Sequence, residues 1–235
     1  MDGNRKVILA VGAHTGDAQL TMGMLLAKHA QQGDKIIVVD LTAGERGCPA
    51  GTTPEEFRPR NVESARKFAR ELGGESIVFD IPDGELRDSP EIELRLARLM
   101  REKQVDAVLY HWKNSIHKDH VEAHRITDNA IFFASLPTFD LDGLAPAPIR
   151  SFLCAENWED AQDFKPYVYM DVSQGFALWE KAINHHAFTV HGSFPYKEYY
   201  SHLKRLRGIE GRRQYCECFM IPPEQVKLVK TLEDM

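Results

Sequence analysis

The strongest constraint on the fold is an alternation of short apolar runs, rich in β-branched residues, with amphipathic stretches. Residues 7–11 and 36–41 have the composition of buried strands, and residues 18–32 between them have the spacing of a helix. A glycine, Gly33, follows this helix at the position where helices commonly end. Strands joined through helices form parallel sheets with helices on both faces and right-handed crossovers. The sequence therefore predicts an α/β fold.

The alternation continues along the chain. It predicts helices at 60–72, 91–102 and 119–134 and strands at 76–81 and 105–110. A proline-containing loop at 136–148 is followed by expected strands at 152–155 and 168–171 and by expected helices at 173–186 and 199–206. We expect a single domain over residues 1–235, with a core βαβ half at 1–135 and a C-terminal part at 136–235 that caps the sheet.

Composition excludes several classes of protein. Lys and Arg number 29 against 35 Asp and Glu, a net charge of −6, and no basic block occurs, so nucleic acid is not an expected partner. The apolar run at residues 7–11 is too short for a signal peptide or a membrane span, which suggests a cytoplasmic protein. The scattered cysteines lack the paired spacing of a structural zinc site, and we expect reduced thiols.

Polar side chains gather where the predicted strands end. In an open parallel sheet the ligand crevice lies beyond the carboxyl ends of the strands. His14 and Asp17 follow the first strand, Glu45 and Arg46 follow the second, and several histidines follow the fourth at 111–120. Neither a dinucleotide fingerprint, nor a phosphate-binding loop, nor a nucleophile elbow occurs in the sequence.

His14, Asp17 and His120 are the candidate metal ligands. Two imidazoles and one carboxylate with open coordination positions form a catalytic arrangement for zinc or a similar divalent ion, which would activate water. A solvated or capping histidine is the alternative for each imidazole, and Asp119 could simply cap a helix. The segment 120–124 does not match the zinc-protease helix, because Glu122 stands one place too late.

Five motifs, in order, carry a resemblance to a known family. The chain resembles the PIG-L/LmbE family of metal-dependent N-deacetylases. The matching motifs are Ala13-His14-x-x-Asp17, Leu41-Thr42-x-Gly44-Glu45-x-Gly47, Asp83-Gly84-x-Leu86, His117-x-Asp119-His120 and a closing segment around Tyr169-x-Asp171-Val-Ser173 and Tyr215-x-Glu217-x-Phe219.

The resemblance implies a Rossmann-like fold and the hydrolysis of N-acetylglucosamine derivatives. It places the zinc ligands on His14, Asp17 and His120, the same residues chosen above. His117 would polarise or protonate the tetrahedral intermediate, and Asp119 would orient a histidine through its other ring nitrogen.

One departure from the family pattern concerns the general base. Typical members read Ala-His-Pro-Asp-Asp, and the first aspartate is the base, but here that position is Gly16. We expect Glu45 to replace it, although an ion pair of Glu45 with Arg46 or Arg58 is an equal alternative. The segment 44–47 also resembles that of a divergent branch, zinc-dependent hydratases of unsaturated dicarboxylates, which likewise lack the aspartate.

Four further residues are candidates for substrate binding. Arg46, Arg58 and Arg60 lie in or just after the loop that follows the second strand, where a guanidinium could bind a carboxylate or sugar hydroxyls. Solvated surface arginines are the alternative. His186 fits the register of a family histidine, without the Ser-Gln pair expected after it.

The sequence thus predicts a zinc-dependent enzyme, with another divalent metal as an alternative, that removes an N-acyl group from a small-molecule amino-sugar derivative. The rival hypotheses are a hydratase on the same metal site and a catalytically silent binding protein. The sequence leaves open whether the chain forms homo-oligomers.

Overall fold

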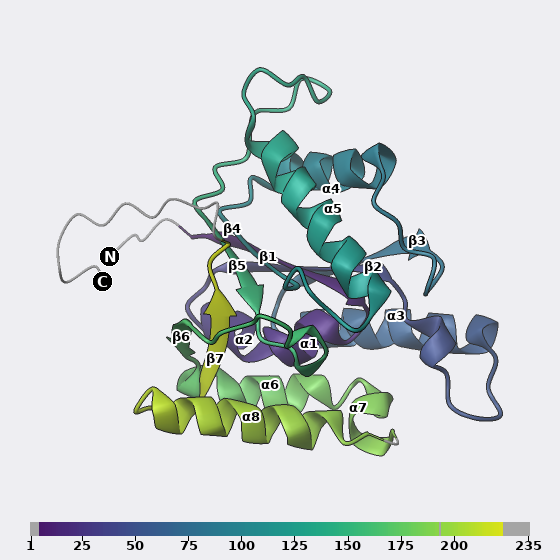
Figure 1. Ribbon diagram of the computed structural model, residues 1–235, viewed down its shortest axis with the longest axis vertical. Helices are drawn as coiled ribbons and strands as arrows, with labels where there is room; N and C mark the ends of the chain where they lie inside the picture. Colours follow the sequence, from purple (N-terminus) through teal and green to yellow (C-terminus); the bar gives the residue numbers. More distant parts are fainter. Residues whose placement is uncertain (1–4, 193, 223–235) are drawn as a thin grey trace.

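The computed structural model describes residues 5–192 and 194–222, which form a mixed sheet between layers of helices (Figure 1). The strands are β1 (Val7–His14), β2 (Lys35–Thr42), β3 (Glu75–Ile81), β4 (Ala107–Tyr110), β5 (Ser151–Ala155), β6 (Val168–Asp171) and β7 (Cys216–Met220). The helices are α1 (Asp17–Thr21), α2 (Gly23–Gln31), α3 (Pro54–Glu71), α4 (Pro90–Lys103), α5 (Lys118–Ser135), α6 (Phe176–Ile183), α7 (Ala187–His191) and α8 (Tyr196–Glu210). Short 3₁₀ turns are η1 (Glu45–Gly47), η2 (Trp158–Asp160) and η3 (Ser173–Gly175).

The strand order is β3-β2-β1-β4-β5-β7-β6. The five strands β1 to β5 are parallel, as predicted, and in-register pairs run along β1 and β2 from Val7 opposite Lys35 to His14 opposite Thr42. One strand that was not predicted, β7, runs antiparallel to both β5 and β6, so the sheet is mixed. The segment of β7 follows α8 after a short turn, and it enters the sheet between two strands that precede it in the chain.

Alternate residues of β1 point to opposite faces of the sheet and reach two separate cores. Leu9 and Val11 pack with α4 and α5 on one face. Ile8 and Ala10 pack with α2, α3, α6 and α8 on the other. In Figure 1, α6 and α8 form an outer layer beyond α1 and α2. The protein therefore has a single-domain α/β fold with helices on both faces of the sheet.

The helix expected at 18–32 is broken at Met22 into α1 and α2. Two buried side chains from the end of the chain satisfy the backbone groups at this break. The Glu217 carboxylate accepts hydrogen bonds from the N–H groups of Met24 and Leu25, and the Lys204 ammonium donates to the carbonyl of Thr21. Helix ends need such partners when they are buried.

The chain order of the strands places the site. After β3 the chain crosses to the other side of β1 and continues with β4, so the sheet has its switch point between β1 and β4. Ligands of open α/β sheets bind at the carboxyl ends of strands at such a point. In the part of the chain that the structure describes, no helix combines the length and the apolar character needed to cross a bilayer.

Candidate metal centre

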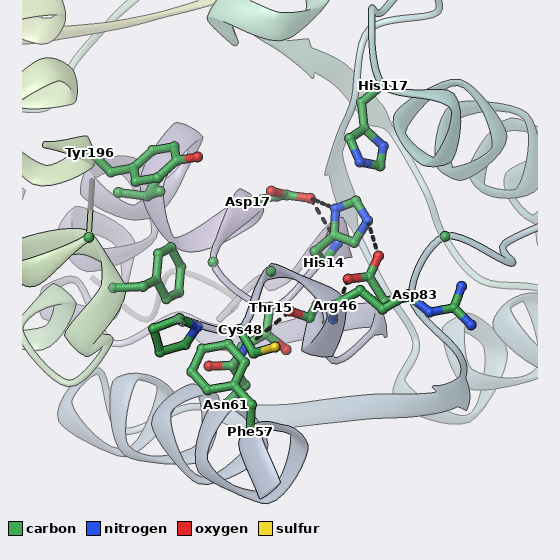
Figure 2. Close-up of a pocket in the computed structure, with 18 of the residues that line it drawn as sticks. His14, Thr15, Asp17, Arg46, Cys48, Phe57, Asn61, Asp83, His117 and Tyr196 are labelled. Atoms are coloured by element: carbon green, nitrogen blue, oxygen red, sulfur yellow. Dashed lines mark hydrogen bonds and ion pairs between the residues drawn. The ribbon is translucent and has the colours of Figure 1, made fainter. Parts of the chain in front are cut away.

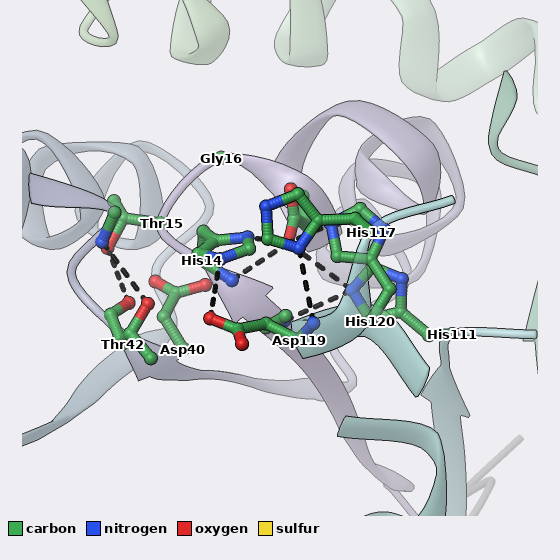
Figure 3. A network of polar contacts seen from close by, with 12 residues as sticks. His14, Thr15, Gly16, Asp40, Thr42, His111, His117, Asp119 and His120 are labelled. Carbon is green, nitrogen blue, oxygen red and sulfur yellow. Dashed lines mark hydrogen bonds and ion pairs between the residues drawn. The ribbon is translucent and has the colours of Figure 1, made fainter. Parts of the chain in front are cut away.

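The imidazoles of His14, His111, His117 and His120 gather at the carboxyl ends of β1 and β4 (Figure 3). Three of them contact the Asp17 carboxylate. Its Oδ2 atom lies 3.2 Å from Nδ1 of His14 and 3.4 Å from Nε2 of His120. Ligand atoms that lie 2.0–2.1 Å from a tetrahedral zinc ion are about 3.3 Å apart. The distances from Asp17 to the two histidines therefore fit a shared divalent cation.

The β1–α1 turn aims His14 and Asp17 at the same point. Gly16 has a φ of 118°, a backbone conformation that residues with a Cβ atom rarely adopt. Its N–H donates to Oε1 of Gln19. The backbone N–H of His14 donates to the Asp17 carboxylate at 2.8 Å. Gln19 in turn donates to the buried Asp40 carboxylate beneath the turn. The turn is thus fixed by its own residues and by β2.

Two carboxylates lie behind His14. Its Nε2 is 3.2 Å from Asp83 and 3.3 Å from Asp119, so Nδ1 is the ring nitrogen that faces Asp17. Burial lowers the pKa of His14, but the carboxylates of Asp17, Asp119 and Asp83 outweigh it and raise that pKa well above its usual value. Asp119 is hydrogen-bonded to Nε2 of His14, the ring nitrogen that faces away from Asp17. The sequence predicted such a contact between Asp119 and a histidine.

His111, which the sequence analysis did not single out, is a fourth residue of the cluster. Its Nε2 lies 3.3 Å from Oδ2 of Asp17 and accepts the N–H of Ala13 at 3.0 Å, while its Nδ1 lies 2.8 Å from Asp160. The carboxylates raise its pKa to about 9 despite burial. The hydrogen bond from Ala13 nevertheless requires an unprotonated Nε2 on His111, since a buried N–H without an acceptor is costly. A cation bound beside Asp17 would offset the negative charge of that carboxylate, which favours protonation of His111.

His117 caps the N-terminus of α5 and lines the cavity. Its Nδ1 accepts the N–H of Asp119 at 3.2 Å, which leaves Nε2 available to the cavity. Burial and the nearby His14 and His120 lower its pKa. Among the described residues, three groups of side chains have ligand atoms close enough to hold a cation: the first is His14, His117 and His120, the second is Asp17, His111 and His120, and the third is His14, Asp83 and Asp119. Each predicted ligand belongs to at least one of these groups, but none of them contains all three predicted ligands. In the second group both nitrogens of His111 already have partners.

A cavity of about 1050 Å³ opens in front of this cluster (Figure 2). Polar groups line the end at His14, and apolar side chains, including Phe57 and Phe188, line other parts of the wall. Arg46 lines the cavity with its guanidinium paired to Glu85, and its backbone N–H donates to Asp83.

The other predicted binding residues lie elsewhere. Arg58 pairs with Glu45 and with Asp80 outside the cavity lining, and Arg60 is exposed on α3. His186 lies in the turn before α7, not within the helix expected at 173–186. It is fully buried, and no hydrogen-bond partner of its ring nitrogens is found among the described residues.

The expected position of Glu45 at the cavity does not occur. Its carboxylate accepts the N–H of Asp83 at 2.9 Å and lies 3.2 Å from a guanidinium nitrogen of Arg58, and Glu45 is absent from the lining of the cavity. The ion pair that the sequence analysis kept as an alternative is present. Glu45 points away from the cavity because it lies in the 3₁₀ turn η1, which directs its side chain toward the end of β3 and toward α3.

Glu159 is a carboxylate of the cavity that the sequence analysis missed. Its Oε2 lies 3.7 Å from Nε2 of His120, and burial raises its pKa. The residue belongs to η2, in an irregular segment without a motif, so the sequence carried no signal for its position.

Comparison with known proteins identifies the family. The model of the PIG-L family, described as GlcNAc-PI de-N-acetylase, matches residues 9–131, more than half of the chain. The protein belongs to the PIG-L family. This result confirms the resemblance inferred from the motifs.

The names of proteins similar to this chain give two kinds of activity, hydratase and deacetylase. A 4-oxalmesaconate hydratase of Pseudomonas putida is 28% identical over 91% of this chain and 84% of its own. The crystal structure of a 4-carboxy-2-hydroxymuconate hydratase from Pseudomonas putida superposes with a TM-score of 0.82 at 24% identity, over 95% of this chain and 100% of that one. An N,N'-diacetylchitobiose deacetylase from Pyrococcus horikoshii superposes with a TM-score of 0.78 at 25% identity, over 94% and 85%.

The PIG-L general-base position is filled by another side chain here. A Cβ atom built on Gly16 would lie 2.4 Å from Cζ of Phe188, far closer than carbon atoms approach. The ring of Phe188, carried by α7, therefore covers the place where the aspartate of typical PIG-L proteins would begin.

Proposed function

We propose that the protein is a metal-dependent hydratase that adds water to a carbon–carbon double bond of an unsaturated carboxylate. The observation that carries the proposal is that residue 16 is a glycine with a φ of 118° and the ring of Phe188 beside it, so no carboxylate stands at the position of the deacetylase base. The 28% identity to a 4-oxalmesaconate hydratase over 91% of the chain supports the same reaction class.

In this proposal His14, Asp17 and His120 hold the cation. Burial raises the pKa of Asp17, but the adjacent His120 and His14 outweigh it and hold that pKa well below its usual range, so the carboxylate is ionised. A divalent cation bound there supplies a Lewis acid and makes water nucleophilic near neutral pH. His14 and His120 each keep one ring nitrogen toward Asp17 and pair the other with a carboxylate.

The remaining cavity residues move protons and orient the substrate. Hydration breaks the π bond of the alkene, joins the water oxygen to one alkene carbon, and moves one water proton to the neighbouring carbon. We assign both acceptance of the water proton and its transfer to that carbon to Glu159, and a hydrogen bond from Nε2–H of His117 to the substrate oxygen on which negative charge develops. Arg46 binds a substrate carboxylate with its guanidinium, in place of its present partner Glu85.

The other predicted residues act at a distance in this proposal. Asp119 orients His14, and Glu45 fixes the loop at Asp83 through the N–H that it accepts. Arg58 holds Glu45 in place. We assign no contact with the substrate to Arg60 or His186, because neither lines the cavity.

An N-deacetylase acting on an amino-sugar derivative is the second candidate function. The match of the family model, described by a de-N-acetylase, and the size of the cavity favour it. Its weakness is the absence of a carboxylate at residue 16.

The test compares both reactions on one preparation. Zinc-loaded protein is incubated with conjugated unsaturated dicarboxylates, with loss of ultraviolet absorbance as the readout, and with N-acetylglucosamine derivatives, with acetate release as the readout. Loss of diene absorbance that requires zinc supports the hydratase. Acetate release without hydration overturns it in favour of the deacetylase, and zinc binding without either reaction overturns both.

A further inference from the structure

Asp160 is a buried carboxylate that holds two histidines at once. It lies in η2, and its side chain has no exposed surface. Oδ1 is 2.9 Å from Nδ1 of His120, and Oδ2 is 2.8 Å from Nδ1 of His111. Because the two oxygens serve different rings, one side chain fixes the orientation of both imidazoles.

The contact with His120 determines which of its nitrogens faces the candidate metal position. A carboxylate accepts hydrogen bonds, so Nδ1 of His120 carries the proton and Nε2 keeps its lone pair. Nε2 is the atom that lies 3.4 Å from Asp17. Asp160 thereby selects the tautomer that can bind a cation.

The contact of Asp160 with His111 also positions the end of β1. His111 donates from Nδ1 to Asp160 and accepts the N–H of Ala13 with Nε2. Ala13 immediately precedes His14 in the chain. The path from Asp160 through His111 to the backbone of Ala13 therefore fixes the end of the strand from which His14 projects.

We infer that Asp160 is a positioning residue that orients two of the candidate metal ligands. It orients His120 directly, and His14 through His111 and the backbone of β1. The inference rests on the proposed metal site and adds a residue to it. Partners that orient metal-bound histidines commonly contribute 10- to 100-fold to metal affinity.

The first experiment measures zinc affinity. Asp160→Asn preserves the shape of the side chain but presents an NH₂ donor to one of the two Nδ1–H groups, so one imidazole must turn or change tautomer. We expect the zinc dissociation constant, measured by competition with a chromophoric chelator, to rise by about 10- to 100-fold. The matched control is Asp163→Asn, an exposed aspartate three residues along, which should leave the constant unchanged.

The second experiment reads the tautomers directly in metal-free protein by long-range ¹H–¹⁵N correlation of the imidazole rings. In the wild type, His111 and His120 should both be protonated at Nδ1, and in Asp160→Asn at least one of them should lose this signature. A purely structural role of Asp160 would change thermal stability without changing tautomers or zinc affinity. His111→Phe removes the contacts of His111 with Ala13, Asp17 and Asp160 but keeps the contact of Asp160 with His120, and it should weaken zinc binding less than Asp160→Asn.

The outcomes separate this inference from the proposed site. Nε2-protonated His120 in the metal-free wild type, or a folded Asp160→Asn variant with wild-type zinc affinity, overturns the positioning role. Zinc affinity that is equal in the wild type and in His14→Ala overturns the metal site itself, whereas the tautomer measurement still tests Asp160. Should Asp160→Asn not fold, the wild-type tautomers and His111→Phe decide.

Discussion

The phenyl ring of Phe188 lies against the α-carbon of Gly16, with Cζ only 2.4 Å from where a Cβ atom would stand. Gly16 also has a φ of 118°. Two separate constraints therefore keep residue 16 a glycine in this chain, a steric one from α7 and a conformational one from the β1–α1 turn. Both concern the position where typical relatives carry their base.

We expect Gly16→Asp not to create an N-deacetylase. A side chain at this backbone conformation costs on the order of 1–3 kcal/mol, and the contact with Phe188 adds to that cost, so the melting temperature should fall. The double variant Gly16→Asp/Phe188→Ala removes the steric part and should recover part of the stability. Acetate release from an amino sugar by the single variant would contradict this account.

The metal-site prediction concerns His14, Asp17 and His120. Replacing any one of them by Ala should lower zinc affinity and abolish turnover, because each supplies one of three converging donor atoms. Zinc content after dialysis, measured by mass spectrometry, is the readout. His202→Ala serves as the control, since His202 is an exposed residue of α8. Full zinc occupancy in His14→Ala would refute the assignment.

The sequence predicts much of this fold because its signals are local. The strands from β1 to β5 and the helix α5 follow periodicity and punctuation within single segments. The break between α1 and α2 was not predictable, since it depends on Glu217 and Lys204, which lie almost two hundred residues away in the chain. The reversed strand β7 was missed for a similar reason, because its direction is set by its neighbours in space.

The candidate site divides in the same way. The proximity of His14, Asp17 and His120 was predictable because they stand in motifs that follow the first and fourth strands. His111 stands directly after β4 and could have been found by position alone, but its partner Asp160 is 49 residues away in an irregular segment. Glu45 was placed wrongly because the sequence shows that a residue follows a strand and does not show which way the following turn directs its side chain.

His117 should be needed for turnover and dispensable for the metal. Nδ1 of His117 accepts the N–H of Asp119, so Nε2 is its chemically available atom. His117→Ala removes this hydrogen-bond donor and should lower kcat by about 10²- to 10³-fold, the usual contribution of one electrostatic stabiliser, with unchanged zinc content. If the variant loses zinc as readily as His120→Ala does, His117 is a ligand and the proposed role is incorrect.

The two glutamates near the site should behave differently. Glu159→Gln removes the carboxylate that lines the cavity and should reduce kcat by about 10²-fold or more. Glu45→Gln weakens a contact with the Asp83 loop and with Arg58, and should lower thermal stability with a much smaller effect on kcat. Steady-state kinetics and thermal melts on both variants check this. A large loss of kcat in Glu45→Gln alone, with Glu159→Gln fully active, would restore the role first expected for Glu45.

His186 should control how stability depends on pH. Burial, with a smaller effect from His185, lowers the pKa of His186 in the folded protein to about 3, against about 6.5 in the unfolded chain. Between these values the unfolded state binds a proton that the folded state does not, so the free energy of unfolding falls as the pH is lowered below 6.5, by about 1.4 kcal/mol per pH unit for this group. His186→Phe places an apolar ring beside Phe68 and Phe188 and should remove this contribution.

Urea denaturation of the wild type and the variant between pH 7 and pH 4 measures how steeply the free energy of unfolding depends on pH. A substitution of an exposed histidine, His202→Phe, is the control. Equal slopes for the wild type and His186→Phe would show that His186 is not a buried neutral group, and a raised KM in His186→Phe at constant stability would support the substrate contact that the sequence suggested.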